Sequence, residues 1–188
     1  MRRHDGSATA LRPKPARHTA HRSHAVQSLA DTSFLLSGIV AGLLVGFFEE
    51  LGWTGFAVPR LTLRNGVLTT GLIVGLLHGA WHLPVFSGAG SSGSLSPALV
   101  LPVQLFSFLP AFRVLMVWVY DRTGSLLVAM LMHLSLTASM LILQPLATGV
   151  ALVTYDLVLA VALWVVVAAV AVANGAQLSR QTLRTRVA

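Results

Sequence analysis

The sequence contains no cysteine and very little charge. Asp, Glu, Lys and Arg together make up only 10% of its 188 residues. The absence of cysteine excludes a disulfide framework, a zinc site with Cys ligands and a thiol nucleophile. The scarcity of charge excludes an ordinary soluble enzyme, in which about a quarter of the residues are charged, and also a largely disordered chain. Because 55% of the residues are hydrophobic, the composition predicts an integral membrane protein with one domain's worth of chain.

The few charges are mostly basic, but their distribution argues against nucleic-acid binding. The formal net charge is +7, and six of the 13 Lys and Arg residues lie within the first 22 positions. Most of the others lie between apolar segments or near the C-terminus, a distribution that orients a chain in a bilayer. We therefore expect the lipid bilayer as a partner, and no nucleic acid.

Three regions follow from the pattern of polar and apolar residues. Residues 1–30 are polar, without an apolar run, which is typical of a disordered basic tail. This tail is too long and irregular for the short basic region of a signal peptide. Residues 31–175 form the expected transmembrane domain, and residues 176–188 form a basic C-terminal tail.

Five apolar segments follow one another in the expected domain. Each has about the 20 residues that a helix needs to cross the hydrocarbon core, and no ten-residue alternating pattern of barrel strands occurs. The sequence thus predicts an all-α, polytopic membrane helix bundle of about five apolar helices, a multi-pass protein of the cell membrane. The segments are 34–58, 67–86, 97–120, 125–146 and 150–173.

Two glutamates interrupt the first apolar segment. Glu49 and Glu50 are the only Glu residues of the chain. An ionisable side chain inside the bilayer costs roughly 2.5–3.5 kcal/mol on insertion scales, and two adjacent carboxylates also repel each other. The pair lies either at a helix end in the membrane interface or in the bundle interior, with a partner or an added proton. The apolar residues 51–58 that follow favour the interior.

Three histidines also lie within apolar segments. His78 and His82 are four residues apart and share one helix face, and His133 shares a face with Thr137 by the same spacing. A single intramembrane His is often only an interhelical hydrogen-bond partner. Because three His and two Glu occur in an otherwise almost uncharged core, we expect one polar cluster that faces the bundle interior.

Glutamate and histidine together allow three kinds of chemistry. A carboxylate and an imidazole can activate a water molecule while other polar groups stabilise an oxyanion. His78, His82 and one Glu could instead supply three zinc ligands, although the His-Glu-x-x-His pattern is absent. A third option is transport of protons or ions through Glu and His. Serine catalysis is less well supported, because no Gly-x-Ser-x-Gly elbow occurs.

Three stretches of the sequence resemble, in order, the motifs of a known family. Residues 49–61, EELGWTGFAVPRL, resemble the Glu-Glu-x-x-x-Arg motif of the CAAX-protease and bacteriocin-processing family (CPBP or ABI). These proteins are intramembrane glutamic endopeptidases related to the type II CAAX prenyl proteases. Residues 81–84, WHLP, resemble the second motif, and residues 114–133 resemble the approach to the third, His-x-x-x-Asn/Asp. The similarity covers about residues 46–140, half of the chain.

The resemblance implies hydrolysis of a peptide bond in a peptide or protein within or at the membrane. It implies that Glu49 and His82 activate a water molecule and that His133 donates a hydrogen bond to the oxyanion. Glu50 is then a supporting carboxylate. No metal or other cofactor is implied by this mechanism, but the family was long described as metalloproteases, so zinc is the alternative cofactor.

Three positions depart from the family pattern. Thr54 stands where motif one has Arg, and Thr137 stands where motif three has Asn. His78 stands where the family usually has an aromatic residue before the motif-two His. Thr137 keeps a hydroxyl donor, so we expect it to support the oxyanion. Thr54 cannot neutralise a carboxylate. We therefore expect His78 to approach Glu50 to about 3 Å and to replace the missing Arg as its partner.

The favoured interpretation is an intramembrane endopeptidase of this family. The alternative is a catalytically degenerate member that acts as a membrane binding or immunity protein, and a transporter is the third reading. An active enzyme requires Glu49, His82 and His133 to converge in one polar cavity, with side chains about 4–10 Å apart. A degenerate one predicts a collapsed cavity or a His133 that is turned away.

Overall fold

The computed structural model describes residues 32–87, 95–143, 148–175 and 178–179, and all regular structure in these ranges is helical. This confirms the expected all-α bundle. The N-terminal tail expected at 1–30 and most of the C-terminal tail lie outside the described residues. The helices are α2 (Thr32–Gly52), the π-helical turn η1 (Trp53–Ala57), α3 (Val58–Thr62), α4 (Val67–Ser87), α5 (Pro97–Phe106), α6 (Leu109–Thr123), α7 (Leu126–Leu143) and α8 (Val150–Ala173).

These helices correspond to the five apolar segments of the sequence. The first segment forms α2 and η1, and α3 continues the helix from the last residue of that segment, Val58, as far as Thr62; the third segment forms α5 and most of α6. Pro110 lies in the first turn of α6, where its missing N–H is not needed by the helix. The fourth segment forms α7, and the fifth forms α8.

Four helical stretches in the described part of the chain are long and apolar enough to cross a membrane. The helix α7 contributes a shorter apolar stretch, Leu126–Met140. The protein is thus a multi-pass membrane protein. The four long stretches are Leu35–Thr62, Val67–Pro84, Ala98–Thr123 and Val150–Ala173.

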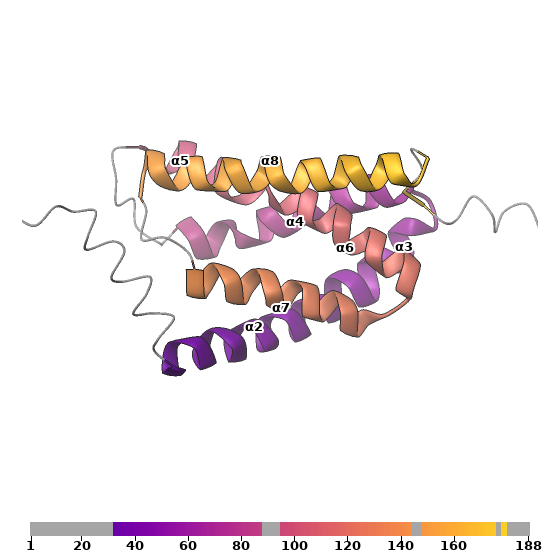
Figure 1. Ribbon diagram of the computed structural model, residues 1–188, viewed down its shortest axis with the longest axis horizontal. Coiled ribbons are helices and arrows are strands. Elements are labelled where there is room, and N and C mark those ends of the chain that lie inside the picture. Colours follow the sequence, from indigo (N-terminus) through magenta and orange to yellow (C-terminus); the bar gives the residue numbers. More distant parts are fainter. Residues whose placement is uncertain (1–31, 88–94, 144–147, 176–177, 180–188) are drawn as a thin grey trace, which may run out of the picture.

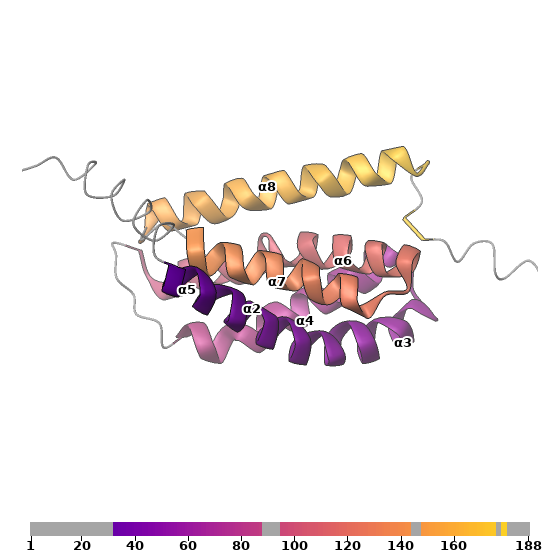
Figure 2. The ribbon, with the colours of Figure 1, turned by 60° about the horizontal axis from the view of Figure 1, so that its bottom comes forward.

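The bundle is built from helix pairs that run side by side. The helix α2 packs along α7, and α4 packs along α6. The helix α8 packs on α5 and α6, and it lies on the opposite side of the bundle from α2 in both views (Figures 1 and 2). The space between the α2–α7 pair and the α4–α6 pair is where the polar residues of the first, second, third and fourth segments meet.

Glycines allow the close approach within the α4–α6 pair. A Cβ atom on Gly71 would lie 2.5 Å from the Cα of Val114, and one on Gly75 would lie 2.5 Å from the Cα of Pro110. Gly79, one turn further, also faces a neighbouring backbone at less than 3 Å. Small residues four apart let two membrane helices approach at backbone distance. This stripe therefore sets how deeply α4, with its histidines, sits against α6.

We expect Gly75→Ala to lower the free energy of unfolding by about 1–3 kcal/mol, because the added methyl group meets backbone atoms that cannot rotate away. Thermal unfolding of the purified protein in detergent measures this effect. The matched control is Gly52→Ala, since a Cβ at Gly52 meets nothing within 4 Å. Equal stability of the two variants would contradict the close packing of α4 on α6.

Candidate active site

The two glutamates lie at the end of α2, immediately before the π-helical turn η1. Consecutive residues of a helix point about 100° apart, and the two carboxylates accordingly have different surroundings. The Glu50 side chain is completely buried, whereas the Glu49 side chain is 21% exposed. Single π-turns are often found at functional sites, and η1 places Thr54 against Glu50. Glu49 is therefore within reach of water, whereas Glu50 is not.

Glu50 is surrounded by hydrogen-bond donors from three other parts of the chain. Its Oε1 atom accepts a hydrogen bond from Arg113 Nη1 at 2.7 Å and another from His133 Nδ1 at 2.6 Å. Its Oε2 atom accepts a hydrogen bond from the Thr54 hydroxyl. All four side chains are buried. The Glu50 carboxylate therefore ties α2, η1, α6 and α7 together, and its oxygens are occupied.

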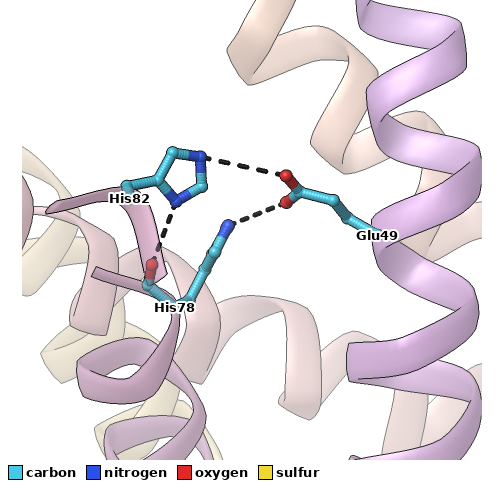
Figure 3. Close-up of side chains that lie close together, drawn as sticks. All are labelled: Glu49, His78 and His82. Atoms are coloured by element: carbon cyan, nitrogen blue, oxygen red, sulfur yellow. Dashed lines mark hydrogen bonds and ion pairs between the residues drawn. The ribbon is translucent and has the colours of Figure 1, made fainter. Parts of the chain in front are cut away.

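Glu49 faces the three intramembrane histidines. His78 Nε2 lies 2.9 Å from Glu49 Oε2, His133 Nε2 lies 3.8 Å from the same oxygen, and His82 Nε2 lies 3.9 Å from Oε1. Figure 3 shows the Glu49 carboxylate on α2 directed at the two imidazole rings of α4. The structure thus places His82 and His133, the histidines of the second and third motifs, next to Glu49 of the first. Both distances to the Glu49 carboxylate are close to the lower limit of the expected range of about 4–10 Å.

The hydrogen bonds of the rings indicate where each imidazole carries its proton. The Nε–H of Arg113 donates to His78 Nδ1 at 2.9 Å, so in the neutral ring the proton of His78 is on Nε2 and is donated to Glu49. The Nδ1–H of His82 donates to the carbonyl oxygen of His78 at 3.0 Å, so Nε2 of a neutral His82 carries a lone pair. His78 is therefore a donor toward Glu49, and His82 presents an acceptor.

The expectation that His78 replaces the missing motif-one Arg as the partner of Glu50 is wrong. His78 hydrogen-bonds to Glu49, and the cation that pairs with Glu50 is Arg113 of α6. In the sequence Arg113 only interrupts an apolar segment, 63 positions after Glu50. The available signal was a single Arg in a membrane segment of a chain whose first segment holds two carboxylates, because such charges pair with one another. Thr54 also contacts Glu50. Glu49 and Glu50 thus each have a hydrogen-bond partner.

Two further polar residues lie apart from this network. Thr137 follows His133 by one turn of α7 and is half-buried, and its hydroxyl makes no hydrogen bond to another described residue. Asp156 of α8 is a buried carboxylate whose two oxygens have no hydrogen-bond partner among the described residues. The motif analysis passed over Asp156, which belongs to neither of the two glutamate networks.

The chemistry of the donors does not suit a zinc ion. The ligand atoms of Glu49, His78 and His82 all lie within 4.8 Å of one another, and a catalytic zinc ion needs three such ligands with a free lone pair on each ring nitrogen. A zinc ion on His78 Nε2 would force the ring proton onto Nδ1, where it would oppose the Nε–H of Arg113. His78 is therefore not a ligand while Arg113 is in place.

The fold and this cluster define a class of protein: a multi-pass helical membrane protein with a carboxylate–imidazole site between its helices. Residues 31–139, more than half of the chain, match the family model of the type II CAAX prenyl endopeptidase Rce1-like proteins. The chain belongs to this family, which confirms the resemblance read from the three motifs. No curated protein and no solved structure matches the chain significantly.

Proposed function

We propose that this protein is an intramembrane endopeptidase in which Glu49 and His82 activate the water molecule that hydrolyses a peptide bond. The observation that carries the proposal is the pair of acceptors, Glu49 Oε1 and His82 Nε2, 3.9 Å apart on facing helices. Two acceptors at this separation can each receive one hydrogen of the same water molecule, whose oxygen then points its lone pairs at a substrate. Membership of a peptidase family supports the same reaction.

The reaction follows from these positions. The water oxygen attacks the carbonyl carbon of the peptide bond while a water proton passes to Glu49. The carbonyl oxygen becomes an oxyanion. When the C–N bond breaks, the proton that Glu49 took from water passes to the leaving nitrogen, which gives a carboxylic acid and an amine. Atoms and charge balance without a metal ion or other cofactor.

His133 supplies the stabilisation of the oxyanion. Its ring lies between the two carboxylates, 2.6 Å from Glu50 and 3.8 Å from Glu49. Nδ1 of His133 faces the Glu50 carboxylate, and Nε2 is the ring atom on the Glu49 side. A ring that carries both protons donates Nδ1–H to Glu50 and Nε2–H to the oxyanion, which is the role we propose for it in the transition state. We assign a supporting hydroxyl to Thr137, one turn further along α7.

The same geometry favours an enzyme over a degenerate binding or immunity protein. A degenerate member was expected to have a collapsed cavity or a His133 that is turned away. Here His133 contacts Glu50, and Arg113 provides the cation. We place the protein in the cell membrane, with peptide or protein substrates that reach the site within or at the bilayer.

A cleavage assay with the full-length protein in detergent tests the proposal. The probes are a farnesylated peptide that ends in a CAAX sequence and the same peptide without the prenyl group, with products identified by mass spectrometry. We expect cleavage of at least one probe by the wild type and none by Glu49→Ala. Cleavage by both proteins at equal rates would refute the proposed site.

Chelation separates water activation by glutamate from zinc chemistry. We expect EDTA to leave the rate of peptide cleavage unchanged, because His78 is held as a donor and cannot complete a three-ligand set. Metal analysis of the active protein accompanies the assay. Full loss of activity with EDTA and recovery with added zinc would contradict the mechanism.

A further inference from the structure

Arg113 links the buried Glu50 to His78, the histidine that hydrogen-bonds Glu49. Its Nη1 atom donates to Glu50 Oε1 at 2.7 Å, and its Nε atom donates to His78 Nδ1 at 2.9 Å. The side chain is only 1% exposed. Because a guanidinium is planar and carries its donors in fixed directions, these two bonds fix both acceptors relative to each other.

We propose that Arg113 is a positioning residue that holds His78 as a hydrogen-bond donor to Glu49 and thereby prevents the site from binding zinc. An arginine does not release its protons in a protein, so Nδ1 of His78 always faces an N–H group and must accept from it. The ring proton then stays on Nε2, 2.9 Å from Glu49 Oε2. This inference rests on the proposed function, since it concerns how Glu49 is presented to water.

Two consequences for Glu49 follow from this arrangement. The hydrogen bond from His78 holds Oε2, so the carboxylate is oriented with Oε1 toward His82. The lone pair that a metal ion would need on His78 Nε2 is used by the ring proton. Glu49, His78 and His82 have ligand atoms close enough for a metal ion, so Arg113 is what excludes it.

The test must remove the bond to His78 without leaving Glu50 as a buried, unpaired charge. We therefore choose the double variant Thr54→Arg/Arg113→Met. The Thr54 hydroxyl already contacts Glu50 Oε2, so an Arg at this position brings a cation to the same carboxylate. The matched control is Arg122→Met, which removes from the same helix an Arg that donates a hydrogen bond to Asn174, outside the cluster.

Two measurements decide the inference, and neither requires activity. The first is the ¹⁵N NMR spectrum of protein labelled at histidine, in which the His78 signals are assigned by comparison with His78→Phe. We expect the Nε2–H form in the wild type and in Arg122→Met, and a mixture with the Nδ1–H form in the double variant. The second is equilibrium dialysis against zinc, in which we expect the double variant to bind zinc about 10–100-fold more tightly than the wild type.

An unchanged His78 tautomer together with unchanged zinc affinity in the double variant would overturn the inference. If the double variant does not fold, Arg113→Lys replaces it, because an ammonium keeps the charge beside Glu50 but lacks the planar fork. The same two measurements then apply, with the same contradicting result. Failure of the proposed function is distinguishable, because it would show as no cleavage of any peptide while the NMR and zinc results stay as expected.

Discussion

Replacing Glu49 by Gln should lower kcat for peptide cleavage by about 10²–10⁴-fold, the usual contribution of a general base. The amide keeps the size of the side chain and can still accept a hydrogen bond from His78. It cannot take a proton from water, because its oxygen is far less basic than a carboxylate oxygen. The Glu49 side chain is also partly exposed and not part of the buried ion pair, so we expect little change in stability.

The control is Asp156→Asn, which makes the same chemical change at a buried carboxylate outside the cluster. We expect this variant to keep the wild-type kcat. Rates of cleavage measured at saturating peptide, together with thermal unfolding of each variant, separate catalysis from folding. A Glu49→Gln protein with more than a tenth of the wild-type kcat would show that another group is the base.

Replacing Glu50 by Leu should cause the largest loss of stability of any single substitution in the cluster. Glu50 and Arg113 form a buried ion pair with 0% and 1% side-chain exposure. Removing one partner of such a pair leaves an uncompensated buried charge and costs about 3–5 kcal/mol. The substitution also removes the acceptor of the His133 and Thr54 hydrogen bonds. We expect low yield and an early unfolding transition in detergent.

The double variant Glu50→Leu/Arg113→Leu shows whether Glu50→Leu destabilises the protein through the unpaired Arg113 charge or through poorer packing of the new side chain. Apolar replacement of both partners of a buried pair is often neutral or stabilising, since no charge remains to be solvated. We expect the double variant to recover most of the stability that Glu50→Leu loses, although not activity. Equal instability of the single and double variants would mean that Glu50 does not depend on Arg113 for its burial.

These two expectations differ because adjacent glutamates meet different neighbours. Glu50 accepts three hydrogen bonds and is completely buried, which suits a role in holding helices together. Glu49 accepts one close hydrogen bond and keeps an oxygen directed at His82. The family motif treats the two as a pair, whereas their environments differ, and on this difference we base the proposal that Glu50 holds the helices together and Glu49 transfers the proton.

Much of this protein was determined by its sequence alone. Apolar segments of about 20 residues can satisfy their backbone hydrogen bonds in a bilayer only as helices, so their number and order predicted the bundle. The order of Glu49, His82 and His133 in the first, second and fourth apolar segments, each within its motif, identified the family. The prediction of the bundle depends on the composition of each segment, and the prediction of the family depends on the spacing of residues within each motif. Both are properties of short stretches of sequence.

Only the tertiary structure decided which charges meet. The partner of Glu50 is Arg113, from a helix two segments away, and the expected partner His78 contacts Glu49 instead. Which side chains face each other depends on how each helix is rotated and how deeply it packs. In this protein close glycine contacts such as that of Gly75 against α6 set that depth. No local spacing encodes it, because a pairing between helices results from all of their packing contacts together.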